Sequence, residues 1–223
     1  FESNTSQKAF EEDVLLAGFG SAPTKSEGSA ISYDDAGQQW TARYQHETVA
    51  LAFSITEEAE EDGQYGSIAS RYTKALARSM ASTKEIKAAN VLNNATSANI
   101  GDGTTLLSTS HPTQNGNQSN TLATAADLSE TSLEAILIQI ADMKDERGLR
   151  IAAQGTKLVI PTAYTFVAER LLESQLRTGT ADNDINAIKS GGYLPGGYHV
   201  MRRLTDADAF YVITDVPDGL KMF

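Results

Sequence analysis

The sequence contains no cysteine among its 223 residues, so neither a disulfide nor a thiolate metal site can form. Stability must therefore come from packing within the chain or against partners. The sequence has no run of about 18 apolar residues, which argues against a transmembrane helix. The first ten residues lack the apolar centre of a secretory signal. Since no methionine opens the chain, we expect it to be a fragment, a processed product or the ordered part of a longer protein.

Positive charge is also scarce, because 18 Lys and Arg residues against 29 Asp and Glu residues give a net charge of -11. Broad binding to a phosphate backbone needs a basic surface, so this composition argues against it. An acidic wall can still enclose nucleic acid without trapping it. Hydrophobic residues make up 40% and charged residues 21% of the chain, as in folded globular proteins. This length allows one large or two small domains with a sizeable core.

Candidate catalytic residues are few and weakly supported. The histidines His46, His111 and His199 lie far apart in the sequence and form no metal-ligand motif. Ser108 or Ser110 could act as the nucleophile of a hydrolase, with His111 as the base. A loop histidine near hydroxyl groups is the better interpretation of this serine- and threonine-rich stretch.

Three further patterns also favour ordinary solvated structure over chemistry. Residues 182–184 read D-N-D, but the glycine and closing glutamate of an EF-hand are absent. The glycine pairs within residues 191–197 are not followed by G-K-[ST], so they predict no phosphate-binding loop. The acidic run at residues 57–62 suits a helix start, where negative charge favours the positive end of the helix dipole. The sequence therefore predicts no catalytic, cofactor or metal site.

The first quarter of the chain predicts projecting structure with little core of its own. Residues 1–29 are polar and glycine-rich and predict an arm. Residues 30–56 predict a long β-hairpin, with a turn signal at residues 34–37 and two stretches of alternating apolar residues after it. An isolated hairpin is marginal in water, so we expect it to pack on something outside itself. Its apolar side chains are Trp40, Tyr44, Val49, Leu51 and Phe53.

A long helix is predicted next, over residues 64–92. Tyr65, Ile68, Tyr72, Leu76 and Met80 recur at spacings of three and four and mark one helix face, and two asparagines end the pattern. Such a helix is about 43 Å long at ~1.5 Å per residue, which suits the spine of an elongated subunit better than a compact enzyme. Residues 96–127, rich in Ser, Thr, Asn and Gly, predict a long loop.

The remainder of the chain mixes helix and strand. Thr131 and Glu134 form a T-x-x-E capping box that predicts a helix over residues 131–147, ending at Gly148. The later predicted elements are a buried strand at 157–160 stopped by Pro161, a helix at 162–172, a glycine-rich loop at 177–197 and strands at 198–204 and 209–214. This order predicts an α+β fold class with layered packing.

Several segments, taken in order, resemble the tailed-bacteriophage major capsid family with its Hong Kong 97-type fold. They are AGFG at 17–20, AISYD at 30–34, QWTARY at 39–44, FSITEE at 53–58, RYTKALARS at 71–79, AANVLNNA at 88–95, LSTSHP at 107–112 and the strand–Pro–helix run at 158–172. Within this family, the chain is most similar to the Mu-like major head subunits.

The resemblance divides the chain into four parts. It implies an N-terminal arm at 1–29, an extended loop at 30–56, a peripheral domain with the spine helix and long loop at 57–149, and an axial domain at 150–223. The extended loop would reach over an adjacent subunit, and axial loops would meet around five-fold and six-fold axes. The implied inter-subunit contact candidates are Trp40, Tyr44, Val49, Leu51, Phe53, Tyr193, Leu194 and Pro195.

The implied function is a structural subunit without enzyme activity, cofactor or membrane contact. Copies would form pentamers and hexamers of an icosahedral shell, assembled in the bacterial cytoplasm, which encloses phage DNA without reading its sequence. Scaffold, portal or decoration proteins would be further partners. On this basis we expect Trp40→Ala and Phe53→Ala to weaken assembly more than the subunit's own fold.

Two departures from the family pattern carry expectations of their own. Residues 28–57 contain no lysine, so the lysine–asparagine isopeptide bond that welds some related shells is not expected. The chain also ends soon after Gly219, so we expect it to lack the strands that return to the peripheral domain.

Three alternatives stay open at the level of sequence. An encapsulin-like nanocompartment shares the fold but encloses cargo enzymes. A soluble hydrolase would use Ser108 and His111 and behave as a compact monomer. A tail or adhesion protein would form trimers or rings rather than closed shells.

Overall fold

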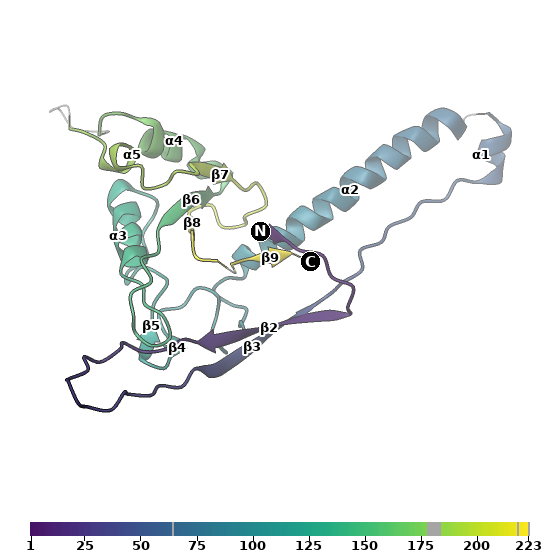
Figure 1. The fold of residues 1–223 in the computed structure, drawn as a ribbon. Helices are drawn as coiled ribbons and strands as arrows, with labels where there is room; N and C mark the ends of the chain where they lie inside the picture. Colours follow the sequence, from purple (N-terminus) through teal and green to yellow (C-terminus); the bar gives the residue numbers. More distant parts are fainter. Residues whose placement is uncertain (64, 178–183, 218, 223) are drawn as a thin grey trace.

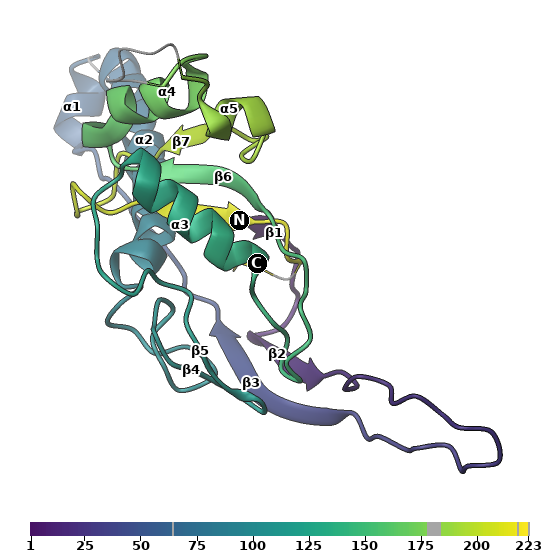
Figure 2. The same cartoon turned by 90° about the vertical axis from the view of Figure 1, so that its left-hand side faces the viewer.

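The structure, a computed structural model, describes residues 1–63, 65–177, 184–217 and 219–222. Figure 1 shows three parts: a region of packed helices and strands, a long helix that reaches away from it, and a two-stranded ribbon that ends in a protruding loop. Figure 2 shows the same loop projecting from the body in a second view. Helix and strand are mixed, which confirms the predicted α+β class.

A three-stranded sheet forms the centre of the packed region. Its middle strand β6 (Gly155–Ile160) lies between β7 (Tyr198–Val200), which is parallel to it, and β8 (Tyr211–Thr214), which is antiparallel. Leu158, Val159 and Ile160 are all buried. A strand with consecutive buried residues is covered on both faces, as the apolar run before Pro161 predicts.

Three helices pack against this sheet and complete one hydrophobic core. They are α3 (Glu130–Ala141), α4 (Thr165–Glu173, preceded by the short 3₁₀ turn Thr162–Tyr164) and α5 (Ala187–Gly191). The buried core residues are Leu128, Leu133, Leu158, Ile160, Ala168, Leu172, Ile188 and Leu194. Because Leu133 of α3 lies in this core, α3 packs on the sheet of the region predicted as axial, and Gln139 of α3 also donates to two carbonyls of the long loop.

Helix α3 begins and ends earlier than predicted. Its capping box joins Ser129 and Ser132, not Thr131 and Glu134: each backbone N–H donates to the other residue's side-chain oxygen, at 3.2 and 2.9 Å. At the other end, the Asp145 carboxylate accepts from two backbone amides of the following turn. A side chain that binds nearby amides competes with the helix, which therefore ends at Ala141 rather than near Gly148.

The long helix is confirmed as α2 (Tyr65–Asn93), with the short α1 (Glu57–Glu61) at its far end. The C-terminal end of α2 is anchored to the packed region. The Asn93 side chain donates to the carbonyl of Arg203 (3.1 Å) and accepts from the amide of Thr205 (3.1 Å), and the Tyr211 hydroxyl donates to the Leu92 carbonyl (3.1 Å). The N-terminal half of α2 projects away from this anchor (Figure 1).

The prediction of a hairpin within residues 30–56 is wrong in its pairing. Strand β3 (Gly37–Gln45) pairs antiparallel with β2 (Phe10–Ala17), which lies in the predicted arm. Residues 46–56 form no strand and run beside α2 (Figure 1). Large apolar residues alternate in residues 49–55, whereas in β2 they are consecutive at residues 14–16, so periodicity favoured the wrong partner for β3.

The protruding loop is therefore residues 18–36, between β2 and β3. It contains Lys25, so the absence of lysine from residues 28–57 says nothing about lysine chemistry in this loop. Glycines and a proline, including Gly18, Gly20, Pro23 and Gly28, break regular structure within the loop.

The C-terminal segment returns to the start of the chain, which lies in the predicted arm. Strand β9 (Lys221–Met222) pairs in parallel with β1 (Glu2–Ser3). The Lys221 Nζ also lies 2.8 Å from the Asp13 carboxylate on β2. Within residues 96–127, β4 (His111–Thr113) and β5 (Gly116–Gln118) form a small hairpin near the β2–β3 ribbon (Figures 1 and 2).

Candidate assembly surface

His111 is held by a buried aspartate rather than by a serine. Its Nδ1 donates to the Asp102 carboxylate at 2.6 Å, and the Thr104 hydroxyl lies 3.0 Å from the same nitrogen. The Ser108 hydroxyl instead accepts from the backbone amide of Ser110, at 3.2 Å. Within the described residues, no hydrogen bond joins Ser108 to His111, so the nucleophile–base pair of a hydrolase is not formed.

The Asp102–His111 pair ties two parts of the long loop together. Burial opposes ionisation of Asp102, but hydrogen bonds from His111 and from the Thr104 amide and hydroxyl outweigh it and lower the pKa of this carboxyl. The side chain of Asp102 is only 5% exposed. A buried ionised carboxylate with several donors fixes local geometry, so this pair acts as a structural clasp between residues 101–104 and β4.

Metal-binding and membrane-spanning features are not found in the described parts of the chain. Among residues 1–63, 65–177, 184–217 and 219–222, no three His, Cys, Asp or Glu side chains are grouped to hold a metal ion. The D-N-D pattern lies largely outside the described residues, since only Asp184 of it is described. None of the described helices is both long and apolar enough to cross a membrane.

The loop at residues 18–36 carries large apolar side chains in solvent. Phe19 is 62%, Ile31 67% and Tyr33 93% exposed. Isolated apolar residues are common on surfaces, but a projecting loop that carries three has no core of its own to stabilise them. These residues are not among the predicted contact candidates: Phe19 lies before the predicted extended loop, and Ile31 and Tyr33 lie within it but were not singled out. The apolar residues within a glycine- and proline-rich stretch were the available signal.

A charged cluster fixes the base of this loop. The Asp34 carboxylate accepts from the Gly20 amide (2.8 Å) and from the Arg147 guanidinium (2.6 Å), so both ends of the loop converge on one side chain. Arg147 also donates to Gln114 in the β4–β5 turn, at 2.9 Å. The Gly20 amide and then Arg147 hold the pKa of Asp34 below its ordinary value. The base of the loop is therefore bound to the body while its apolar residues project.

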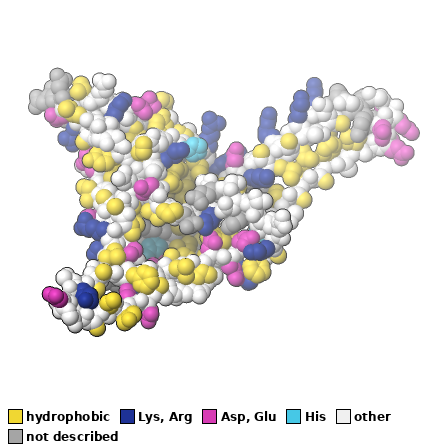
Figure 3. All heavy atoms as spheres, in the orientation of Figure 1, with side chains coloured by type: hydrophobic (Ala, Val, Ile, Leu, Met, Phe, Trp, Pro, Cys, Tyr) yellow, Lys and Arg dark blue, Asp and Glu magenta, His cyan; other side chains and the backbone are white. Residues whose placement is uncertain are grey.

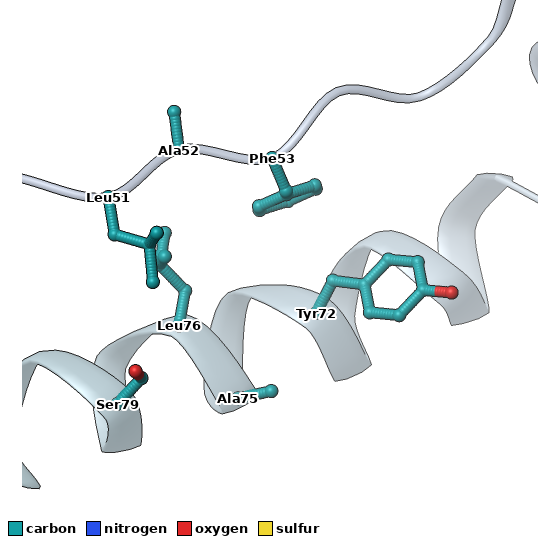
Figure 4. Close-up of a pocket in the computed structure, with 7 residues that line it drawn as sticks. All are labelled: Leu51, Ala52, Phe53, Tyr72, Ala75, Leu76 and Ser79. Carbon is teal, nitrogen blue, oxygen red and sulfur yellow. The ribbon is translucent and has the colours of Figure 1, made fainter.

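An apolar groove lies on the projecting half of α2 (Figure 4). Residues 51–53 run beside the helix, and Phe53 contacts Tyr72 with ring centroids 5.8 Å apart. The groove has a volume of about 290 Å³ and is lined by Leu51, Ala52, Phe53, Tyr72, Ala75, Leu76 and Ser79. Leu51, Phe53 and Tyr72 stay at least two-fifths exposed, so the groove is open to a further apolar group.

The structure divides the predicted contact residues of the ribbon region into two groups. Trp40, Tyr44 and Val49 are half-buried, whereas Leu51 and Phe53 are exposed at the groove. Trp40 packs on Gly101 of its own chain so closely that a Cβ on Gly101 would lie 2.4 Å from the indole ring. Trp40 thus stabilises the subunit itself, which is at odds with the expectation that Trp40→Ala acts mainly on assembly.

The three candidates in the glycine-rich loop also differ. Tyr193 and Pro195 are exposed, but Leu194 is buried in the core of the packed region with 8% exposure. The burial of Leu194 within its own chain, between exposed neighbours, argues against its proposed inter-subunit contact. Composition does not determine which side chains of a short loop face the core.

The chain matches one protein family in sequence and two solved structures in fold. The model of a family described as phage capsid protein matches residues 39–223. The chain is similar in fold to the structure "Bacteriophage JBD30 capsid", with a TM-score of 0.64, 14% identity and coverage of 92% of this chain and 86% of that one. A second structure, the JBD30 capsid decorated with minor capsid protein trimers, gives a TM-score of 0.67, 12% identity and coverage of 90% and 88%. No curated protein matches the chain.

Proposed function

Because the chain belongs to the phage capsid protein family, whose model matches residues 39–223, we propose that its copies join as pentamers and hexamers of an icosahedral shell. The chain is a structural major capsid subunit of a tailed phage and is located in the virion. The family match carries this conclusion, and it favours the phage shell over an encapsulin-like compartment or a hydrolase. We also propose that the subunit has no catalytic activity and that the shell encloses DNA without reading its sequence.

The proposed subunit contact joins the loop at residues 18–36 to the groove on α2 of an adjacent copy. The loop presents Phe19, Ile31 and Tyr33 to solvent, and the groove presents Leu51 and Phe53. Burial of apolar area stabilises a contact by roughly 25 cal/mol per Å², before the costs of ordering are subtracted. Both surfaces are exposed in the single chain, so each would gain this stabilisation only from a neighbour.

The domain assignment that this function uses follows the observed core. We propose an axial domain that contains α3 together with residues 150–215, and a peripheral domain built on α2. Tyr193 and Pro195, exposed in the glycine-rich loop, are proposed to lie near the rotation axes of the rings. Membership of the Mu-like subgroup is likewise a proposal, as are a scaffold, a portal or a decoration protein like the trimers named for the JBD30 capsid.

Negative-stain electron microscopy with light scattering tests the function on the longest natural form of this chain. Closed shells with five-fold and six-fold rings are the expected result. Trimers or open rings would support a tail or adhesion protein instead. A stable monomer that never assembles would contradict the shell function, and an assay of ester hydrolysis on the same sample would test the Ser108–His111 alternative.

A further inference from the structure

The projecting half of α2 is basic, although the chain as a whole is strongly acidic. No Asp or Glu occurs between Asp62 and Glu85, whereas Arg71, Lys74 and Arg78 fall in this stretch. Their spacing of three and four residues places them on one side of the helix, over roughly 10 Å of its length. These three exposed residues are called the basic ridge. Figure 3 shows Lys and Arg side chains along one side of the projecting helix and acidic side chains at its far end.

The basic ridge lacks partners in its own chain. Within the described residues, no ion pair joins the ridge to a carboxylate, whereas two charged residues of the anchored half of α2 are paired. There Lys87 pairs with Glu47, and Glu85 lies 3.7 Å from Arg203. These exposed charges form no ion pair that would stabilise the subunit's own fold, so they are free to contact another molecule.

The same chain carries a compact acidic surface at the α1 end. The α1 end, residues 57–62, holds five carboxylates in six residues, and none of them forms an ion pair within the described parts of the chain. Glu57, Glu60 and Glu61 are spaced to lie on one side of α1, over roughly 6 Å. This is the densest run of carboxylates in the sequence, and it lies at the far end of the helix (Figure 1).

We propose that the basic ridge of one subunit binds the α1 end of a second copy of this chain. The contact rests on the proposed function, because it joins subunits of the shell, but it is separate from the contact of the loop with the groove. Complementary charge favours a second copy over nucleic acid. A net charge of -11 repels a polyanion beyond the three ridge residues, whereas the α1 end offers them three carboxylates on one side of a helix.

Charge reversal tests the contact from both sides. In the ridge variant R71E/K74E/R78E, like charges face each other, and we expect the critical concentration for assembly to rise at least about tenfold at low salt. The effect should shrink at high salt, where exposed charges are screened. The α1 variant E57K/E60K/E61K should show the same loss. Mixing the two variants, or combining all six changes in one chain, should restore assembly.

Matched controls separate this contact from general charge effects. Lys84→Glu makes the change of Lys74→Glu on another side of the same helix, and it should leave assembly unchanged. A chain that combines the ridge variant with E27K, D127K and D184K regains net charge without regaining complementarity, and it should stay defective. Circular dichroism should show unchanged helix content in the ridge variant, because its three side chains are exposed.

The outcomes distinguish the contact from the shell function. If the wild-type chain assembles and the ridge variant assembles equally well at low salt, the contact is overturned and the shell function stands. If the ridge variant assembles normally but its shells lose retention of nucleic acid, the ridge binds a polyanion and the contact is overturned. If the wild-type chain forms neither shells nor smaller oligomers, the contact and the shell function fall together.

Discussion

The Asp34 carboxylate lies 2.6 Å from the Arg147 guanidinium, although 113 residues separate them in the sequence. Through this ion pair and the Gly20 amide, one side chain gathers both ends of the projecting loop and binds them to the turn after α3. The position of the loop relative to the packed region is thereby fixed at its base. A subunit that must place this loop on a neighbour needs its base held while its apolar residues stay free.

Asp34→Asn should loosen this loop without unfolding the subunit. The change removes the ion pair with Arg147 but keeps a polar group of the same size. We expect faster amide hydrogen exchange across residues 18–36 and normal exchange in the packed region. Asp35→Asn is the matched control, since its neighbouring carboxylate forms no ion pair within the described residues. Equal exchange in both variants would show that the pair does not hold the loop.

A fall in pH should loosen residues 18–36 in the same way as Asp34→Asn. The pKa of Asp34 is lowered in the folded chain, so its stabilising contribution is present above the ordinary aspartate pKa and is lost as pH falls through the folded value. The protection of residues 18–36 against amide exchange, corrected for the pH dependence of the intrinsic rate, should therefore fall in the acidic range in the wild type. The Asp34→Asn variant has no carboxylate at this position, so protection of its loop should not change over the same pH range. Identical pH profiles for both proteins would show that the change does not come from Asp34.

Gly101→Ala should destabilise the contact between Trp40 on β3 and the long loop. The added Cβ would lie 2.4 Å from the Trp40 ring, so the indole must move, at a cost of about 1–3 kcal/mol. Trp40 is the only tryptophan, so its fluorescence reports the displacement directly. Gly18→Ala, where an added Cβ meets nothing within 4 Å, serves as the control. An unchanged spectrum and melting temperature would show that the contact tolerates the methyl group.

Asp102→Ala should destabilise the long loop by about 1–3 kcal/mol, because the imidazole of His111 and the Thr104 hydroxyl lose their shared acceptor. The lowered pKa of Asp102 predicts that this clasp weakens only as pH falls through the folded value, below the ordinary aspartate range. Denaturant unfolding at several pH values measures both effects. Wild-type stability at low pH equal to that at neutral pH would contradict the clasp.

Leu194→Ala should act on folding, whereas Tyr193→Ala should act on assembly. Leu194 is buried in the core, so its truncation should cost about 2–5 kcal/mol. Tyr193 is exposed, and its removal should leave the melting temperature nearly unchanged while particle yield falls. Thermal melting and particle counts on both variants check this division. A large loss of stability in Tyr193→Ala would remove Tyr193 from the proposed contacts.

Phe53→Ala should reduce particle yield more than subunit stability. Its ring is 42% exposed and contacts Tyr72, so the isolated subunit should lose only about 1 kcal/mol. The contact with a neighbour's loop, in contrast, would lose the apolar surface on which the loop is proposed to lie. Tyr33→Ala on the loop should give the same assembly defect, and proportional losses of melting temperature and yield would contradict the shared contact.

Local patterns in the sequence determined the elements of this protein well. The spine helix was predictable within about a residue, because apolar spacing and the asparagine stop act within one turn of each position. The buried strand before Pro161 was predictable for the same reason. The absence of cysteine and the scarcity of positive charge excluded whole classes of site. The ordered segments also pointed to a capsid fold, which the family and structural matches bear out.

The tertiary structure alone decided which segments meet. Strand β3 could pair with either flanking stretch, and only packing selected β2, which moved the projecting loop from residues 30–56 to residues 18–36. Leu194 faces the core because of the direction of one short loop. The bonds of Asp34 to Arg147 and of Asp102 to His111 depend on how loops fold back on the body. Strand pairing and loop return are long-range events, whereas sequence periodicity reports only which face of each element is apolar.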